Sequence, residues 1–201
     1  MNYGLIQITP PGAEPLDLAE VMKHCNEWDD SNGPYIQNVM IPSARQRAEI
    51  ETGRQLITAT WKLTLPRFPC DVILLPKGRV QSVEEIKYVA PDGTETILDD
   101  ELWRLLDDRE PAEIEPVDYW PATHCRRRSA VSIKFRVGYG DAAEDVPHLL
   151  KAGMLMAIGH WYENRQEVLT GTIATLIPKS ASDIFEQHRV GDDYVNYEKG
   201  G

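Results

Sequence analysis

Apolar positions along the 201-residue chain change their spacing twice. Residues 34–52 carry apolar side chains three and four positions apart, which predicts a helix that ends at Gly53. Pro42 lies inside this run and should kink or split the helix, because proline has no backbone N–H. From residue 56 the spacing becomes two, as in a strand, and the helical spacing returns over residues 147–165. The order of helices, strands and helices predicts an α+β fold.

Strand patterns fill a β-rich region at about residues 55–138. Its first strand, residues 56–68, shows the strongest alternation of apolar and polar side chains. Further strands are expected at residues 71–76, 80–90, 95–98, 102–106, 112–117 and 129–140. Asp92 and Gly93 form a tight turn, because glycine readily adopts the left-handed backbone that a hairpin needs. The sequence therefore predicts a block of antiparallel strands.

Breaker residues divide the chain into three segments. Residues 1–16 are expected to form an extended arm, because three prolines there exclude a regular helix. Residues 17–177 form the α+β domain, and residues 178–201 form a short helix followed by a polar tail.

Two helix starts carry the signature of a capping box, in which one side chain caps the helix and another reaches back three positions. Asp17 and Glu20 have this spacing at the start of the domain. Ser180 and Asp183 have it at the start of the short C-terminal helix.

Charge and cysteine content limit the classes of function. The chain carries 21 Lys and Arg against 32 Asp and Glu, a formal net charge of −11. Phosphate binding needs clustered cations, so bulk attraction to nucleic acid is not expected. The three cysteines are odd in number and widely spaced, which argues against a disulfide framework and fits a reducing compartment. No stretch resembles a signal peptide or a membrane span, so we expect a soluble protein made in a cytoplasm.

The segment "GHWYENR" gathers residue types that are common in active sites. His160 and Glu163 are three positions apart and can share one helix face, but a zinc site on a helix typically needs a second histidine four positions away. The nearest other histidine is His148, so packing by Trp161 and a polar helix end explain the segment better. No catalytic, cofactor-binding or metal-binding residues are therefore expected, and a metal-dependent enzyme that uses His160 and Glu163 is the less favoured alternative.

Arg126, Arg127 and Arg128 stand together in an acidic protein. Two interpretations remain open. The arginines form a docking patch for an acidic neighbour or a phosphate, or they lie in a solvated loop before a strand.

Several segments, taken in order, resemble a family of tailed-phage proteins. They span most of residues 5–189 and are "ITPPGAEPLDLAEVMKH", "AEIETGRQLITATWKLTLPRFP", "LPKGRVQSVEEIKYVAPDGTETIL", "VSIKFRVGYGDAAEDVPHLLKAGMLMAIGHWYENRQEV" and "IFEQHR". The chain resembles the head-tail connector or adaptor proteins of the gp6/gp15-like type, and phiE125 gp8-like proteins are the nearest branch. Gene transfer agents, which are domesticated phage particles, use the same type of adaptor, so the resemblance extends to them.

The resemblance implies a helical connector-type domain, with N-terminal helices and a long C-terminal helix around the central antiparallel strands. It implies a homo-oligomeric ring, a dodecamer in the particle, between the portal protein and a stopper or other tail-side connector protein. DNA would pass through the channel without sequence-specific binding, and neither a membrane nor a cofactor is implied. The location would be the head-tail junction of a virion or phage-like particle, after synthesis in the bacterial cytoplasm. The alternative is a cytoplasmic assembly factor that the particle does not retain.

Contact residues follow from the same resemblance. Residues 178–201 are expected to dock on the portal, and the turn at Asp92–Gly93 is expected to face the next tail component. Candidate residues of a subunit or portal interface are Tyr162, Glu163, Arg165, Ile184, Phe185, Arg189, Tyr194 and Tyr197. Removal of the residues after Ile177 is expected to leave a folded protein that no longer attaches to portal-bearing heads.

Overall fold

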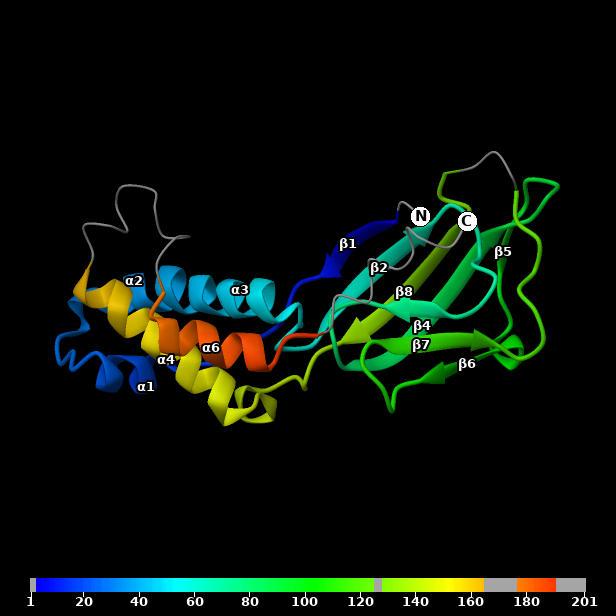
Figure 1. Ribbon diagram of the computed structural model, residues 1–201. Helices are drawn as coiled ribbons and strands as arrows, with labels where there is room; N and C mark the ends of the chain where they lie inside the picture. The colour runs from blue at the N-terminus through cyan, green and yellow to red at the C-terminus, as the bar shows by residue number, and fades with distance from the viewer. Residues whose placement is uncertain (1–2, 125–127, 165–176, 191–201) are drawn as a thin grey trace. The chain divides into compact units, whose positions relative to one another are not determined.

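The chain combines helices with antiparallel sheets, so the α+β class is confirmed (Figure 1). The computed structural model describes residues 3–124, 128–164 and 177–190. Its backbone forms two compact units, and each is described by itself. The β unit takes its described residues from Met1–Pro10, Thr58–Gly138 and Val190–Gly201, and the helical unit takes its from Pro11–Ile57 and Tyr139–Arg189. The boundaries expected after residues 16 and 177 do not coincide with these units.

The β unit contains two antiparallel sheets. The five-stranded sheet has the order β1 (Gly4–Thr9), β2 (Ala59–Leu65), β8 (Val131–Val137), β4 (Val80–Val89) and β5 (Glu95–Ile97). The three-stranded sheet has the order β3 (Ile73–Leu75), β7 (Ala112–Pro116) and β6 (Trp103–Leu106). Every strand expected from the alternating pattern is present and slightly shorter than expected.

Both sheets contribute side chains to one core. Leu63 of β2 lies opposite Ile133 of β8 in the register, and both are buried with Ile114 of β7. On the other face of the same strands, polar residues alternate with these apolar ones, as in Lys62 and Lys134. Period-two alternation in β2 and β8 therefore buries one face of these two strands and leaves their other face polar.

The first residues of the chain are a strand in the β unit rather than a separate arm. β1 pairs with β2 from Gly4 opposite Thr64 to Thr9 opposite Thr60, with an irregularity between Gln7 and Thr9. The extended backbone expected there is present, but it is tied to the sheet by backbone pairing. Prolines 10 and 11 follow the strand directly and end it, since proline cannot donate to a ladder.

The helical unit packs its helices around a second core. Its elements are α1 (Leu18–His24), α2 (Gly33–Tyr35), a π-helix (Ile36–Met40), α3 (Ile41–Thr52), α4 (His148–Glu163) and α6 (Lys179–Gln187). Short 3₁₀ turns lie at Asp30–Asn32 in this unit, at Ala143–Asp145 before α4, and at Asp100–Leu102 in the β unit. The largest fully buried side chains of this core are those of Ile36, Ile41, Leu56, Ile57 and Phe185.

Pro42 splits the second helix as the sequence predicts. The N–H of Ile41 bonds to the carbonyl of Ile36, five residues back, which closes a π turn just before the proline. Pro42 then sits in the first turn of α3, where its missing N–H costs nothing. At the other end, Gly53 takes a left-handed φ of 69° and ends α3.

The two capping predictions differ in outcome. Asp17 does cap α1, since its carboxylate accepts a hydrogen bond from the N–H of Ala19 at 2.7 Å. The capping box predicted from Ser180 and Asp183 is wrong. α6 begins at Lys179 after Pro178, which places Ser180 inside the first turn.

Candidate functional site

The end of α4 is the place where the sequence concentrates polar and aromatic residues. Trp161 is buried in the helical core, as expected. Tyr162 is half-buried, and its hydroxyl lies 3.4 Å from the Nδ2 of Asn32, which donates to it. Glu163 is exposed, and Arg165 lies outside the described residues. Among these residues, Glu163 is the one whose side chain is most accessible to a neighbour.

His160 is engaged by its own helix end. The Nδ2 of Asn164 donates to the carbonyl oxygen of His160 at 2.9 Å and lies 3.3 Å from the ring Nδ1. Across residues 3–124, 128–164 and 177–190, no three His, Cys, Asp or Glu side chains gather closely enough to hold a metal ion. The expectations that the chain has no metal site and no enzymatic activity remain predictions.

The loop between α1 and α2, residues 26–32, presents an aromatic side chain that sequence reasoning missed. We call it the Trp28 loop. Trp28 is 80% exposed, although its indole N–H donates to the Oδ1 of Asn26 at 3.0 Å. Asn26 has a left-handed φ of 54°, a conformation that asparagine tolerates better than most residues.

Side-chain hydrogen bonds hold this loop in one shape. The N–H of Asp29 donates to Glu27 at 3.0 Å, and the N–H and hydroxyl of Ser31 both donate to the Asp29 carboxylate. Asn32 donates to the second Glu27 oxygen at 2.7 Å, and it also bonds Tyr162 on α4. An exposed tryptophan on an ordered loop is typical of a protein–protein anchor, since little conformational entropy is lost on binding.

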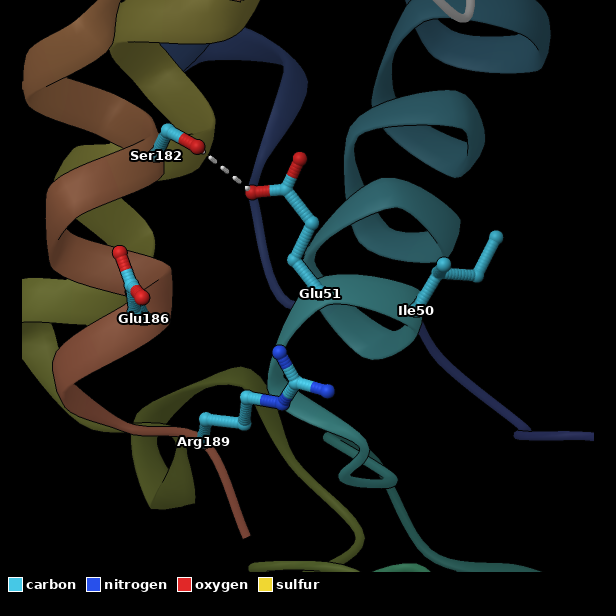
Figure 2. A pocket seen from close by; sticks show the side chains of 5 residues that line it. All are labelled: Ile50, Glu51, Ser182, Glu186 and Arg189. Atoms are coloured by element: carbon cyan, nitrogen blue, oxygen red, sulfur yellow. Dashed lines mark hydrogen bonds between the residues drawn. The ribbon is translucent and has the colours of Figure 1, made fainter. Parts of the chain in front are cut away.

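A pocket of about 320 Å³ opens between α3 and α6 in the helical unit (Figure 2). It is lined by Ile50, Glu51, Ser182, Glu186 and Arg189. The hydroxyl of Ser182 donates to Glu51 at 3.3 Å, and Arg47 also pairs with Glu51, so this carboxylate is held from two sides. Ile50 is 76% exposed at the pocket's border, which leaves an apolar side chain beside charges of both signs.

The three described interface candidates on and after α6 lie in unlike surroundings. Arg189 is exposed and lines the pocket, so it is accessible to a partner. Ile184 is half-buried against the helical core, and Phe185 is fully buried in it. A docking role for Phe185 stays a prediction, and in this structure its ring packs inside its own unit.

Most of the remaining candidate contact residues lie outside the described residues. Of the three arginines before β8, Arg128 is described and exposed, and Arg126 and Arg127 lie outside the described residues. Tyr194 and Tyr197 also lie outside them. The structure therefore leaves both interpretations of the arginine cluster open.

A charged cluster ties the segment before α1 to α3. Arg45 bonds Glu14 at 2.8 Å and Glu49 at 3.1 Å. The other oxygen of Glu49 accepts from Gln55 at 2.6 Å and from the N–H of Leu56 at 3.2 Å. Burial lowers the pKa of Arg45, but the hydrogen bond to Glu14 and both nearby carboxylates outweigh it and raise the pKa above its usual value.

Three solved structures with a similar fold come from one kind of particle. The chain shares its fold with gene transfer agent (GTA) proteins. A chain from the neck of an empty GTA particle, computed with C6 symmetry, aligns with a TM-score of 0.74 and 22% identity, over 94% of this chain and 96% of that one. A chain from the virion of a native GTA particle aligns at 0.73 and 21%, over 93% and 95%. A chain from the neck of a native GTA particle, computed with C12 symmetry, aligns at 0.69 and 23%, over 95% and 96%.

No family model matches the sequence, and no curated protein matches it. Of the helices that the structure describes, none combines the length and apolar character needed to cross a membrane.

Proposed function

We propose that the chain is a structural protein in the neck of a phage-like particle, where it forms an adaptor ring between the portal and a stopper or tail protein. One observation carries the proposal. The fold matches chains from GTA particle necks over nearly the whole length of both chains. The proposal assigns the chain no chemical step, and that absence remains a prediction.

A ring is the assembly that this proposal requires. The similar neck chains come from structures computed with C6 and C12 symmetry, which favours several copies around one axis. The adaptor would then hold one copy for each portal subunit. Neighbouring copies in such a ring contact each other through two different surfaces, because the contact is head to tail.

The acidic composition fits a channel that DNA crosses without being held. A net charge of −11 gives little attraction for phosphates, whereas a basic bore would bind the duplex and slow its passage. DNA is therefore a passing cargo in this proposal, and sequence-specific contacts are not part of it.

Partner contacts are assigned to exposed, ordered features. Trp28 anchors a neighbouring protein of the neck, since its loop is held by hydrogen bonds and its ring is exposed. The pocket between α3 and α6, which Arg189 helps to line, and residues 191–201 are together the candidate contact on the portal side. The turn at Gly93 is the candidate contact on the stopper side.

Loss of the protein tests the proposal. Cells that lack the gene should release DNA-filled heads without tails, and a plasmid-borne copy should restore tailed particles. Tailed particles of normal yield and infectivity or transfer activity from the deletion strain would overturn the neck role. Restoration by a copy that is then missing from purified particles would favour the assembly-factor alternative.

A further inference from the structure

The five-stranded sheet of the β unit has two unlike edges. Among the described strands, β1 pairs only with β2, and β5 pairs only with β4, so these two strands are the opposite edges of the sheet. Each edge therefore has a side on which no described strand supplies a backbone partner. Each edge also carries exposed apolar side chains.

The β1 edge surface consists of Ile6, Ile8 and Lys62. Ile6 and Ile8 are 51% and 45% exposed, and Lys62 lies opposite Ile6 in the register on the same face of the sheet. The strand Gly4–Thr9 contains no charged residue and no proline. Edge strands commonly carry charges or proline to prevent pairing with other chains, so an uncharged edge with two exposed isoleucines is suited to being covered.

The β5 edge surface is apolar and mainly acidic, and Lys87 of β4, which lies opposite Ile97, pairs with Glu85 at 2.9 Å. Ile97 on β5 and Leu102 just after it are 60% and 50% exposed. The exposed carboxylates beside them are Glu95, Asp99, Asp100 and Glu101. The short turn that carries these groups is ordered, because the Asp99 carboxylate accepts from the N–H of Glu101 at 3.1 Å.

We infer that the β1 edge surface of one copy of this chain docks on the β5 edge surface of the next copy. The inference rests on the proposed function, since it names the contact by which the ring closes. In this contact, Ile6 and Ile8 of one copy pack against Ile97 and Leu102 of the next, and Lys62 pairs with the carboxylates of the β5 edge surface. A contact between two β1 edges would instead leave Lys62 of each copy without an opposite charge to pair with.

Because the two surfaces lie on opposite edges of the sheet, the same contact can repeat from copy to copy. When one copy uses its β1 edge, its β5 edge stays available for a third copy, so the contact is heterologous, which is the type of contact from which rings are built. The occupant of each surface is therefore a second copy of this chain.

Carbodiimide coupling of purified particles tests the contact in the unmodified protein. The reagent joins a lysine amine to a carboxylate only when the two groups touch. Lys62 on β2 lies three strand spacings from β5 in its own chain, about 14 Å between backbones, which is beyond direct coupling. Peptides that join Lys62 to Glu95, Asp99, Asp100 or Glu101 must therefore come from two copies, and we expect to find them by mass spectrometry.

Charge reversal provides an independent second readout. Lys62→Glu alone and Asp100→Lys alone should each reduce incorporation into particles at least fivefold, and the combined variant should recover part of the loss, because it restores one pair of opposite charges. Asp107→Lys is the matched control, since Asp107 is exposed in the same unit outside the β5 edge surface. Lys62→Glu should not disturb the fold, because Lys134 lies opposite it in the register.

The outcomes separate this inference from the proposed function. If the chain is present in particles but Lys62 shows no such coupling and the combined variant gives no rescue, the edge contact is wrong and the neck role stands. If the chain is absent from particles, the neck role and the edge contact both fall.

Discussion

Gly153 on α4 lies directly against the ring of Phe185 on α6. A Cβ at Gly153 would lie 2.8 Å from Cε1 of Phe185 and 3.3 Å from Cγ2 of Ile184. The two helices can approach this closely only because position 153 has no side chain. The contact joins α6 to the core of the helical unit.

Gly153→Ala should therefore destabilise the helical unit. Overpacking of a buried contact costs about 1–3 kcal/mol, and alanine returns up to about 1 kcal/mol through its higher helix propensity. We expect a net loss of about 1–2 kcal/mol in the free energy of unfolding, measured by urea denaturation followed at the helical circular dichroism signal. Gly159→Ala is the control on the same helix, since its Cβ would meet only the exposed His24 ring, at 3.2 Å. Equal stability of the two variants would contradict the close-packing account.

Arg45 should contribute to stability far more than an exposed arginine with similar partners. Arg45→Met leaves the Glu14 and Glu49 carboxylates without their cation, and the Arg45 side chain is only 11% exposed. We expect a loss of about 2 kcal/mol in the free energy of unfolding. Arg109 pairs with Asp108 and Glu113 in an exposed position, so Arg109→Met should unfold at the same urea concentration as wild type. An unchanged free energy of unfolding in Arg45→Met would show that the charged cluster does not contribute to stability.

Trp28→Ala should impair assembly and leave the fold intact. The ring is largely exposed, so stability should change by less than about 0.5 kcal/mol. A tryptophan anchor typically contributes about 2 kcal/mol or more to binding, which corresponds to at least about 30-fold in affinity. The variant would be co-expressed with the wild-type chain, and mass spectrometry of purified particles would give the ratio in which the two chains are incorporated. Tyr119→Ala, at a similarly exposed tyrosine of the β unit, is the control, and equal incorporation of the Trp28→Ala and wild-type chains would remove Trp28 from the interface.

Two truncations should behave differently. The sequence predicts that removal of everything after Ile177 leaves a folded protein, but that cut removes α6 with the buried side chains of Ala181 and Phe185. We now expect it to unfold the helical unit. A cut after Val190 keeps α6 and should give a folded chain that no longer attaches to portal-bearing heads. Circular dichroism measures the folding of the two truncated chains, and a head-attachment assay measures their docking. Normal attachment of the chain cut after Val190 would contradict docking through residues 191–201.

The central strands were predictable from the sequence because one face of each is buried. Alternation such as that of Leu63 and Leu65 in β2, or Ile133 and Phe135 in β8, is imposed by the core and remains visible without any structure. Pro42 and Gly53 were equally informative, since each has a backbone requirement that few alternatives meet.

Features that depend on distant contacts were not predictable. β1 alternates weakly because Ile6 and Ile8 lie on the exposed face, so the pattern showed only an extended segment. The start of α6 was misplaced because Pro178 favours an earlier beginning than the Ser180 signal. The Trp28 loop depends on Asn32 reaching Tyr162, 130 positions along the chain, and no local pattern encodes that bond.

Copy number in the particle tests the central claim most directly. Purified particles would be digested and quantified by mass spectrometry with isotope-labelled peptides from this chain and from the portal protein. A neck ring predicts one copy of this chain per portal subunit, unchanged after washing with high salt. A trace amount that washing removes, or a chain found only in the cell lysate, would contradict the claim.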